Sequence, residues 1–372
     1  MNYIKPSFTN IYLRFDAFIH DSFRRNWSKH YSINQLKDAK PNYKNWKKLT
    51  RNEKKEIVSY WGIKDPRKSD FITHEIMLNV HGKFDVRYCP EKIFRVYLDP
   101  GLSDRKIVSA WDDKNYFELH QPNLPFPKTI LRNVNGYFLD SNYSHVQIND
   151  AKDIILNNLP VIIKPSIDSG EGKNLRLISH KDEVDDVLNN YKKNYIVQEL
   201  IIQCDEFKKL SPKSVNAMRV VTAIINGKAV LLSSVLLCNT TDSIACNKNV
   251  SAGVGVVIIG IDENGKLDDI GYFENAKQIQ TLPNGVKFGG IKVPSYKKVI
   301  ELALKAHESM PMLGIIGWDI TVDKDDNPIF IEWNLRGIGM YHSQLATGPL
   351  FGEYSQQFAD ISKKLIQNWK KK

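Results

Sequence analysis

Apolar residues recur three or four positions apart through residues 1–80, which is the spacing of helices that each bury one face. Within this region Thr50 and Glu53 have the spacing of a capping box at the start of a helix. From about residue 150, short apolar runs alternate with helical stretches, as in a small α+β lobe. Longer apolar runs follow, the first two joined at Asn226-Gly227, which favours a hairpin turn.

A proline-rich break at residues 122–127 separates these regions, because proline favours extended backbone and ends helices. We therefore predict a mainly helical, basic N-terminal domain (1–120), a small lobe (121–200) and a large lobe (201–372). The predicted helices beyond residue 100 are 106–115, 150–159, 181–191, 295–309 and 353–371. The predicted strands are 95–98, 160–164, 175–178, 195–201, 219–225, 229–238, 255–262, 315–322 and 329–333.

The last two predicted strands flank a polar segment that favours a turn. We expect the turn to close with Val322 opposite Ile329. That register places Asp319 opposite Glu332, and Asn334 shares the face of Glu332 because strand side chains alternate in direction. Like charges directly opposite one another are destabilising, so a cation should lie between them. Mg²⁺ suits these oxygen ligands; the alternative is an exposed edge hairpin with solvated carboxylates.

The composition, 42% hydrophobic and 25% charged, is ordinary for a globular protein. The four cysteines, at positions 89, 204, 238 and 246, show no CxxC spacing, which favours reduced thiols. No stretch approaches 18 consecutive apolar residues, and the first residues lack the apolar core of a signal peptide. A cytoplasmic protein without membrane spans is the expectation.

Basic residues concentrate between Arg24 and Lys68, a segment that contains 14 Lys and Arg residues but only 4 Asp and Glu residues. Such a segment attracts anionic lipid headgroups, phosphorylated sugars or nucleic acid. No zinc finger or other nucleic-acid motif accompanies it, so nucleic-acid binding is not expected. The segment predicts a peripheral contact with an anionic membrane surface, at the inner face of the membrane; the alternative is a solvated helical face.

A glycine-containing polar loop, residues 166–173, follows the predicted strand that ends at Lys164. It matches neither the P-loop nor the dinucleotide-binding pattern. Its backbone N–H groups could close over phosphates, with Lys164 at the base and Lys128 as a second cation. The alternative is an ordinary surface turn. Further along, Gln198 and Glu199 lie on a strand whose backbone suits the edge of an adenine.

Taken in order, these residues resemble the ATP-grasp superfamily: Lys128, Lys164 with its loop, Gln198-Glu199-Leu200, Asp319, and Glu332-Trp333-Asn334. Further stretches, 214–222, 249–253, 334–336 and 342–352, resemble the branch associated with sugar transfer and polysaccharide biosynthesis. The superfamily usually has an aliphatic residue where this chain has Trp333.

The resemblance implies an α+β, ATP-grasp fold in which two lobes clamp ATP, preceded by the helical domain. It assigns Lys128 and Lys164 to the phosphates, and Ser169, Gly170 and Gly172 to a covering loop. It assigns Gln198, Glu199 and Leu200 to adenine, and Glu206 to the ribose. It assigns Asp319, Glu332 and Asn334 to Mg²⁺, and Arg219, acting with Lys164, to the charge on the transferred phosphoryl group.

The expected reaction is ATP- and Mg²⁺-dependent ligation of a carboxylate to an amine through an acyl phosphate. The resemblance implies a cell-surface polysaccharide or a sugar precursor as acceptor, for example a uronic acid that receives an amino acid. Phosphoryl transfer to a sugar and a non-catalytic ATP-binding or membrane-surface scaffold are the alternatives. Candidate residues for the acceptor site are Asn216, Lys248, Asn249 and Ser251. His342 is a candidate base or acceptor contact, and the alternative is a loop histidine without such a role.

Overall fold

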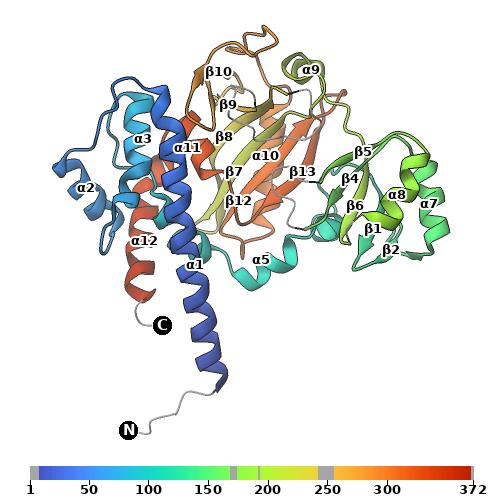
Figure 1. Cartoon of the computed structure of the whole chain (residues 1–372), viewed down its shortest axis with the longest axis horizontal. Helices are drawn as coiled ribbons and strands as arrows, with labels where there is room; N and C mark the ends of the chain where they lie inside the picture. Colours follow the sequence, from blue (N-terminus) through green and yellow to red (C-terminus); the bar gives the residue numbers. More distant parts are fainter. Residues whose placement is uncertain (1–7, 168–173, 192, 242–254, 370–372) are drawn as a thin grey trace. The chain divides into compact units, whose positions relative to one another are not determined.

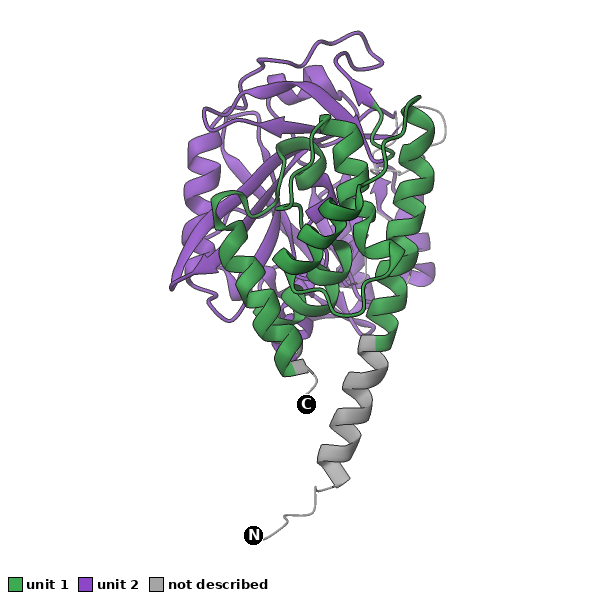
Figure 2. Cartoon of the chain, turned by 90° about the vertical axis from the view of Figure 1, so that its left-hand side faces the viewer, with its two compact units in different colours: residues 1–104, 275–277, 343–372 green, residues 105–274, 278–342 purple. Residues whose placement is uncertain are grey.

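The computed structural model describes residues 8–167, 174–191, 193–241 and 255–369 (Figure 1). It contains two compact units, coloured separately in Figure 2. Unit 1 comprises residues 1–104, 275–277 and 343–372, and unit 2 comprises residues 105–274 and 278–342. The C-terminal residues thus group with the N-terminal ones, and both predicted lobes contribute to unit 2. The division into three domains stays a prediction.

Unit 1 is built from helices, as predicted for the N-terminal region. Its longer helices are α1 (Phe8–Ala39), α2 (Arg51–Trp61), α3 (Ile72–His81) and α12 (Ser355–Trp369). The predicted capping box begins α2: the Thr50 hydroxyl accepts the Glu53 N–H at 3.2 Å, and Glu53 accepts the Thr50 N–H at 2.6 Å. No helix in the described part of the chain is long and apolar enough to cross a membrane.

The predicted strand at residues 95–98 is wrong. Residues Ile93–Leu98 form a π-helical segment, η3, which continues into α4 (Asp99–Leu102). η3 packs against α1 and α12, and five of its six residues are buried. A short, mostly apolar segment is suited both to a buried helix and to a buried strand, so its neighbours decide its conformation.

The small sheet of unit 2 has six strands in the order β3-β2-β1-β6-β4-β5 (Figure 1). Their bounds are β1 (Thr129–Val134), β2 (Tyr137–Leu139), β3 (His145–Val146), β4 (Val161–Pro165), β5 (Arg176–Ile178) and β6 (Tyr195–Glu199). Helices α7 (Ile148–Leu156) and α8 (Asp182–Asn190) share a core with this sheet. Val161 and Ile163 point into that core, so Ile162 and Lys164 point to the other face.

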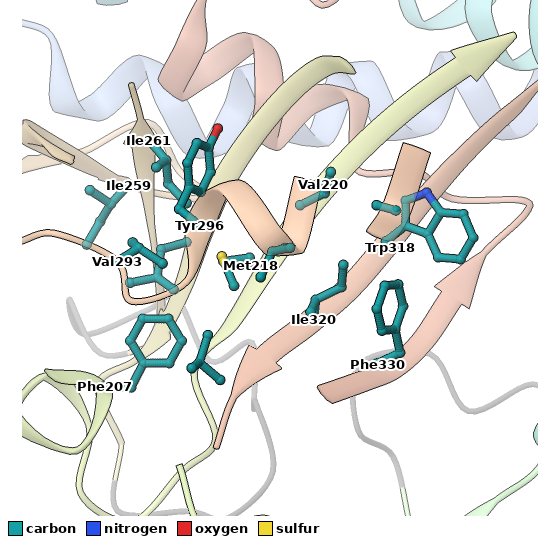
Figure 3. Packing of buried hydrophobic residues seen from close by; sticks show 14 of the residues in the cluster. Phe207, Met218, Val220, Ile259, Ile261, Val293, Tyr296, Trp318, Ile320 and Phe330 are labelled. Carbon is teal, nitrogen blue, oxygen red and sulfur yellow. The ribbon is translucent and has the colours of Figure 1, made fainter. Parts of the chain in front are cut away.

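The large sheet of unit 2 has seven strands in the order β11-β10-β9-β8-β7-β12-β13. Their bounds are β7 (Ala217–Ile225), β8 (Lys228–Asn239), β9 (Val256–Ile261), β10 (Leu267–Phe273), β11 (Gln278–Ile279), β12 (Ile315–Val322) and β13 (Pro328–Asn334). Trp318, Ile320 and Phe330 pack on one face of the sheet, together with residues of helix α10 (Tyr296–Glu308) (Figure 3). The predicted hairpin between β7 and β8 is confirmed, and Asn226 and Gly227 both have positive φ, as its tight turn requires.

The hairpin of β12 and β13 has two registers. Asp319 lies opposite Glu332, as predicted, but Val322 lies opposite Pro328, so the predicted pairing with Ile329 is wrong. A bulge between Asp319 and Ile320 accounts for the difference, since the pairing shifts by one residue there.

Candidate functional site

Three charged side chains form a row across β7, β12 and β13. Arg219 lies opposite Asp319, and Asp319 lies opposite Glu332, so all three share one face of the large sheet. This face is opposite to the one that carries Trp318 and Ile320. The sheet therefore has this hydrophobic core on one face and the charged row on the other, and the strand register alone brings the three charges together.

Arg219 binds Asp319 through two parallel contacts. Its Nε donates to Oδ1 at 2.5 Å and its Nη2 donates to Oδ2 at 2.9 Å. Only 10% of the Arg219 side chain and 12% of the Asp319 side chain are exposed. This two-point geometry is the strongest form of an ion pair between these residue types. Burial raises the pKa of the Asp319 carboxyl, and the Arg219 guanidinium partly opposes that shift.

Glu332 has a cationic partner that the sequence did not reveal. Lys114 Nζ lies 2.9 Å from Glu332 Oε2, and both side chains are largely buried. Lys114 begins the short helix η4 (Lys114–Tyr116), and its backbone N–H donates to the Ser166 carbonyl at 3.0 Å. Lys114 is thus in contact with both the end of β4 and the face of β13.

Protein cations lie beside both carboxylates of the acidic pair, and the predicted Mg²⁺ between them stays a prediction. Burial raises the pKa of Glu332, but Lys114 and Lys164 together outweigh that effect and hold the pKa below its ordinary value. Lys164 faces this cluster from β4. Burial and the nearby Lys114 ammonium lower the pKa of Lys164 to about 8, although Glu332 and Asp319 oppose the shift.

Asn334 completes the cluster. Its amide Nδ2 donates to Asp319 Oδ2 at 3.2 Å and to the Gly317 carbonyl at 3.3 Å. Gly317 lies opposite Asn334, and a Cβ there would come within 2.8 Å of the Ile338 backbone. The absence of a side chain at Gly317 therefore lets the segment after β13 approach the sheet beside the charged row.

The other nucleotide-site candidates lie around the end of β6. Lys128 Nζ lies 2.9 Å from Glu199 Oε1, and both side chains are well exposed. The Gln198 amide is buried and donates to the Pro127 carbonyl at 3.1 Å. Leu200 is 37% exposed. The structure thus brings Lys128, Gln198, Glu199 and Leu200 together at the end of β6, and their contact with a nucleotide stays a prediction.

Lys128 and Lys164, the two lysines predicted to bind phosphate, lie beside different residues of β6. Lys128 precedes β1 and accepts the Glu199 N–H through its carbonyl, whereas Lys164 lies opposite Ile196. Since each strand residue advances the chain by roughly 3.3 Å, the backbones of these lysines are about three residues apart along the sheet. Lys114, which the prediction omitted, lies near enough to Lys164 in the charged cluster to lower the pKa of its ammonium group.

The remaining candidates are more dispersed. Glu206 lies on helix α9 (Asp205–Leu210), where its carboxylate, Cys204 Sγ and the Asp326 carboxylate are within 4.8 Å of one another. Asn216 is buried, and its amide donates to the Phe207 carbonyl at 2.8 Å. Six candidates lie outside the described residues: Ser169, Gly170, Gly172, Lys248, Asn249 and Ser251.

His342 also has a defined partner. Its Nε2 lies 2.7 Å from Glu274 Oε1, and both side chains are partly buried. Helix α11 (Met340–Thr347), which carries His342, begins directly after Gly339. A Cβ at Gly339 would lie 2.7 Å from Arg219 Nη1, so the chain passes close to the charged row just before it reaches His342.

Trp333 has a clear structural role. Its ring lies 4.0 Å from Phe117 and 6.1 Å from Trp318, measured between centroids. Its indole Nε1 donates to the Trp111 carbonyl at 2.8 Å. The large ring fills space between β13 and the segment 111–117, from which Lys114 reaches Glu332. Trp333 therefore supports the position of Lys114.

The donor set of this cluster fits a Mg²⁺ ion. Asp319, Glu332 and Asn334 offer carboxylate and amide oxygens on one face, and Mg²⁺ prefers such ligands. Three cations, Lys114, Lys164 and Arg219, already face the two carboxylates. A further divalent cation would leave excess positive charge unless an anion came with it. The cluster is therefore suited to a metal that arrives with phosphate groups.

Comparison with known proteins gives one extensive match. The family model described as sugar-transfer associated ATP-grasp matches residues 94–358, which is well over half of the chain. No curated protein matches the chain.

Several solved structures share distant similarity. D-alanyl-alanine synthetase A from Vibrio cholerae is 11% identical, with a TM-score of 0.43 and coverage of 70% of this chain and 66% of that chain. N5-carboxyaminoimidazole synthase from Aspergillus clavatus is 11% identical, with a TM-score of 0.39 and coverage of 68% and 53%. L-amino acid ligase from Bacillus licheniformis is 13% identical, with a TM-score of 0.36 and coverage of 70% and 48%. The chain spans about half the length of the last two.

Proposed function

The chain belongs to the sugar-transfer associated ATP-grasp family, and from this premise we propose that it is an ATP- and Mg²⁺-dependent ligase that joins a carboxylate to an amine. The observation that carries the proposal is the charged cluster on the large sheet. Its acidic pair is largely buried, each carboxylate has a cation beside it, and Lys164 faces both, which is an arrangement suited to a triphosphate with its metal.

The reaction that we propose has two steps. A carboxylate oxygen of the acceptor bonds to the γ-phosphorus of ATP, the bond to the β,γ-bridging oxygen breaks, and ADP leaves. The amine nitrogen then bonds to the acyl carbon, inorganic phosphate leaves with the electrons of the broken C–O bond, and the nitrogen loses one proton. The first step activates a carboxylate that does not condense with an amine in water.

The residues of the chain have distinct parts in this proposal. Lys164 and Arg219 stabilise negative charge on the transferred phosphoryl group, which develops most strongly in the transition state. Asp319 holds Arg219 in place by the two-point contact. Lys114 orients Glu332, and Trp333 supports Lys114. These fixed contacts reduce the reorganisation that the site needs when its substrates bind.

Asp319, Glu332 and Asn334 are the residues that would hold Mg²⁺, which would screen the phosphate oxygens and orient them. Lys128 and the loop with Ser169, Gly170 and Gly172 would contact and cover the phosphates. Gln198, Glu199 and Leu200 would bind adenine, and Glu206 the ribose. The ion pair between Lys128 and Glu199 supports the adenine site more than the phosphate site, because it holds Lys128 beside a residue assigned to adenine.

The acceptor that we propose is a saccharide or sugar precursor of a cell-surface polysaccharide, such as a capsule, and the donor is a small amine. The family description, which refers to sugar transfer, supports the saccharide class. Synthesis of such a precursor would take place in the cytoplasm, at or near the inner face of the membrane. His342 and Glu274 are candidate contacts for the acceptor because α11 follows the segment beside Arg219.

A substrate screen tests the reaction. Purified protein with ATP and Mg²⁺ is given candidate acids and amines singly and in pairs, and ADP release is measured together with the product masses. Release that requires both an acid and an amine supports the ligase. A phosphate group found covalently on a sugar would instead show a kinase-type reaction.

Two variants connect the activity with the cluster. Asp319→Asn and Glu332→Gln keep the side-chain shapes and remove one charge each, and each should lower turnover by a factor of at least about 100. Asp325→Asn is the matched control, because Asp325 lies on the same hairpin, is exposed, and has a carboxylate that pairs with the neighbouring Lys324. Full function in cells with both variants would favour a non-catalytic scaffold.

A further inference from the structure

A small cavity in unit 1 is lined mainly by basic side chains. Its volume is about 110 Å³, which is smaller than the roughly 300–1,000 Å³ of sites for whole small molecules. α1 contributes part of the wall, the segment between α2 and α3 another part, and Lys92, directly before η3, the remainder. The lining residues are Arg25, Ser28, Lys29, Lys64, Asp65, Arg67, Ser69, Asp70 and Lys92. A cavity of this size suits a single compact group.

The wall of this cavity is held in place by Asp70. The Asp70 carboxylate is buried, accepts the Arg67 backbone N–H at 3.0 Å and forms an ion pair with Lys92 at 2.8 Å. The Asp70 and Lys92 charges therefore cancel within the wall. The same contact fixes the backbone that carries Arg67, so the basic side chains project from an ordered frame.

The other cations of the cavity are not neutralised in this way. Lys29, Lys64 and Arg67 form no ion pair with any residue that the structure describes. Arg25 lies over the Tyr97 ring at 5.4 Å, a contact that keeps its full charge. Asp65 is the one further carboxylate among the lining residues. Four cations thus face one unmatched anion, and the cavity carries a positive charge.

We propose that this cavity is a binding site for a phosphate-type anion, either a soluble phosphate ester or the phosphate of a lipid headgroup. Two arginines and two lysines can donate charge-assisted hydrogen bonds to phosphate oxygens, and the Ser28 and Ser69 hydroxyls can donate more. The site lies wholly within unit 1 and does not depend on the proposed ligase activity.

The cavity also makes the basic segment more specific. Four of the basic residues between Arg24 and Lys68 line the cavity. The cavity has a fifth basic residue, Lys92, which lies outside that segment. Lys44 and Lys48 are exposed and do not line it. If anions were attracted only by the overall positive charge, all of these basic residues would contribute equally to binding. A defined site would depend on the residues that line the cavity.

Titration of the full-length protein with inorganic phosphate at low ionic strength, followed by calorimetry, tests the site. The double variant Lys64→Gln/Arg67→Gln should weaken phosphate binding by roughly a factor of ten for each removed charge. The control Lys44→Gln/Lys48→Gln removes the same charge from the same segment and should bind as the unchanged protein does. Since both pairs are exposed, the urea midpoints of unfolding should agree for all three proteins.

Phosphate can also bind the charged cluster of unit 2, so Lys164→Gln is measured in parallel. Binding that survives Lys164→Gln and is lost in the cavity variant supports the proposal. Binding that is lost only in Lys164→Gln belongs to unit 2 and overturns it. Equal losses in the cavity and control variants would also overturn it, because they would show attraction by general charge alone, and so would the absence of binding in the unchanged protein.

Sedimentation with vesicles distinguishes the two sources of phosphate. Phosphatidylcholine vesicles with and without phosphatidylglycerol are compared for the same three proteins. Retention that requires phosphatidylglycerol and the cavity residues identifies a lipid headgroup. Phosphate binding without vesicle retention identifies a soluble phosphate ester. Both results support a phosphate site, and neither depends on ATP turnover.

Discussion

The charged cluster of unit 2 and the basic cavity of unit 1 differ in whether their charged side chains form ion pairs. In the cluster, each buried carboxylate has its own cation within 3 Å: Arg219 for Asp319 and Lys114 for Glu332. In the cavity, Lys29, Lys64 and Arg67 have no carboxylate partner among the described residues. Removing one charge therefore has different consequences: in the cluster it leaves a buried partner uncompensated, and in the cavity it removes only attraction for a ligand.

The largest effect is expected at the pair of Arg219 and Asp319. Asp319→Ala leaves a buried guanidinium without its partner, so the free energy of unfolding should fall by about 3–5 kcal/mol. Urea denaturation monitored by tryptophan fluorescence measures it. The double variant Arg219→Met/Asp319→Leu replaces the pair by apolar side chains and should recover most of the loss. A loss below about 1 kcal/mol in Asp319→Ala would contradict the comparison.

A smaller loss is expected at Lys114. Lys114→Gln removes the charge-assisted contact to Glu332 and should cost about 2 kcal/mol of unfolding free energy near neutral pH. The pKa of Glu332 is held below its ordinary value of 4.5, so this contribution is present above that value and is lost as the pH falls through the lowered pKa. The difference between the two proteins should therefore narrow in acid. Lys324→Gln, at an exposed pair on the same hairpin, should change stability by less than about 0.5 kcal/mol.

Lys164 should show its pH dependence in a different, alkaline range. Its pKa is lowered to about 8 from 10.5, so the folded protein holds this proton less tightly than the unfolded chain. Its destabilising effect at neutral pH is relieved as the pH rises from about 8 to 10.5. Affinity for ATP should fall over the same rise, by about tenfold, because the ammonium group is lost. Titrations between pH 7 and 10 measure this, and Lys164→Gln should bind weakly at every pH.

The smallest effect on stability is expected in the basic cavity. Lys64→Gln and Arg67→Gln remove charges without a partner, so each should change the free energy of unfolding by no more than about 0.5 kcal/mol. These substitutions should instead weaken the binding of an anion in the cavity. Destabilisation as large as that expected for Asp319→Ala would mean that the cavity charges are structural, and the contrast between the two regions would fail.

The fold was predicted where neighbouring residues hold the information. The ATP-grasp fold inferred from the order of its motifs agrees with the family match. The capping box at Thr50 and the turn at Asn226-Gly227 depend on contacts within a few residues. The opposition of Asp319 and Glu332 also lies within one hairpin. In each case the chemistry that fixes the structure is visible in a short stretch.

The hairpin register shows where that reasoning stops. Phe330 and Trp333 are both buried in the core, although residues three apart in a regular strand point to opposite faces. The bulge resolves this conflict, since an extra residue between them brings both rings to one side. The odd spacing of the two aromatic residues is a signal that a strict alternation overlooks.

Lys114 and segment 93–98 depended on distant partners. Lys114 is 218 positions from Glu332 along the chain, and no local pattern distinguishes it from other lysines on short helical turns. Segment 93–98 became a buried π-helix because α1 and α12 pack around it, and α12 comes from the other end of the sequence. Neither partner could be inferred before the topology was known.

Unit 1 combines segments from both ends of the sequence, and this has a consequence for synthesis on the ribosome. The Ser362 hydroxyl of α12 donates to the Trp61 carbonyl at 3.0 Å, and Phe351 packs 6.3 Å from the Trp61 ring. Residues 105–342 have all been translated before these contacts can form. The nascent chain must therefore hold its first helices with an open hydrophobic surface while unit 2 is made, and a pause or truncation near residue 342 would leave that surface accessible to chaperones.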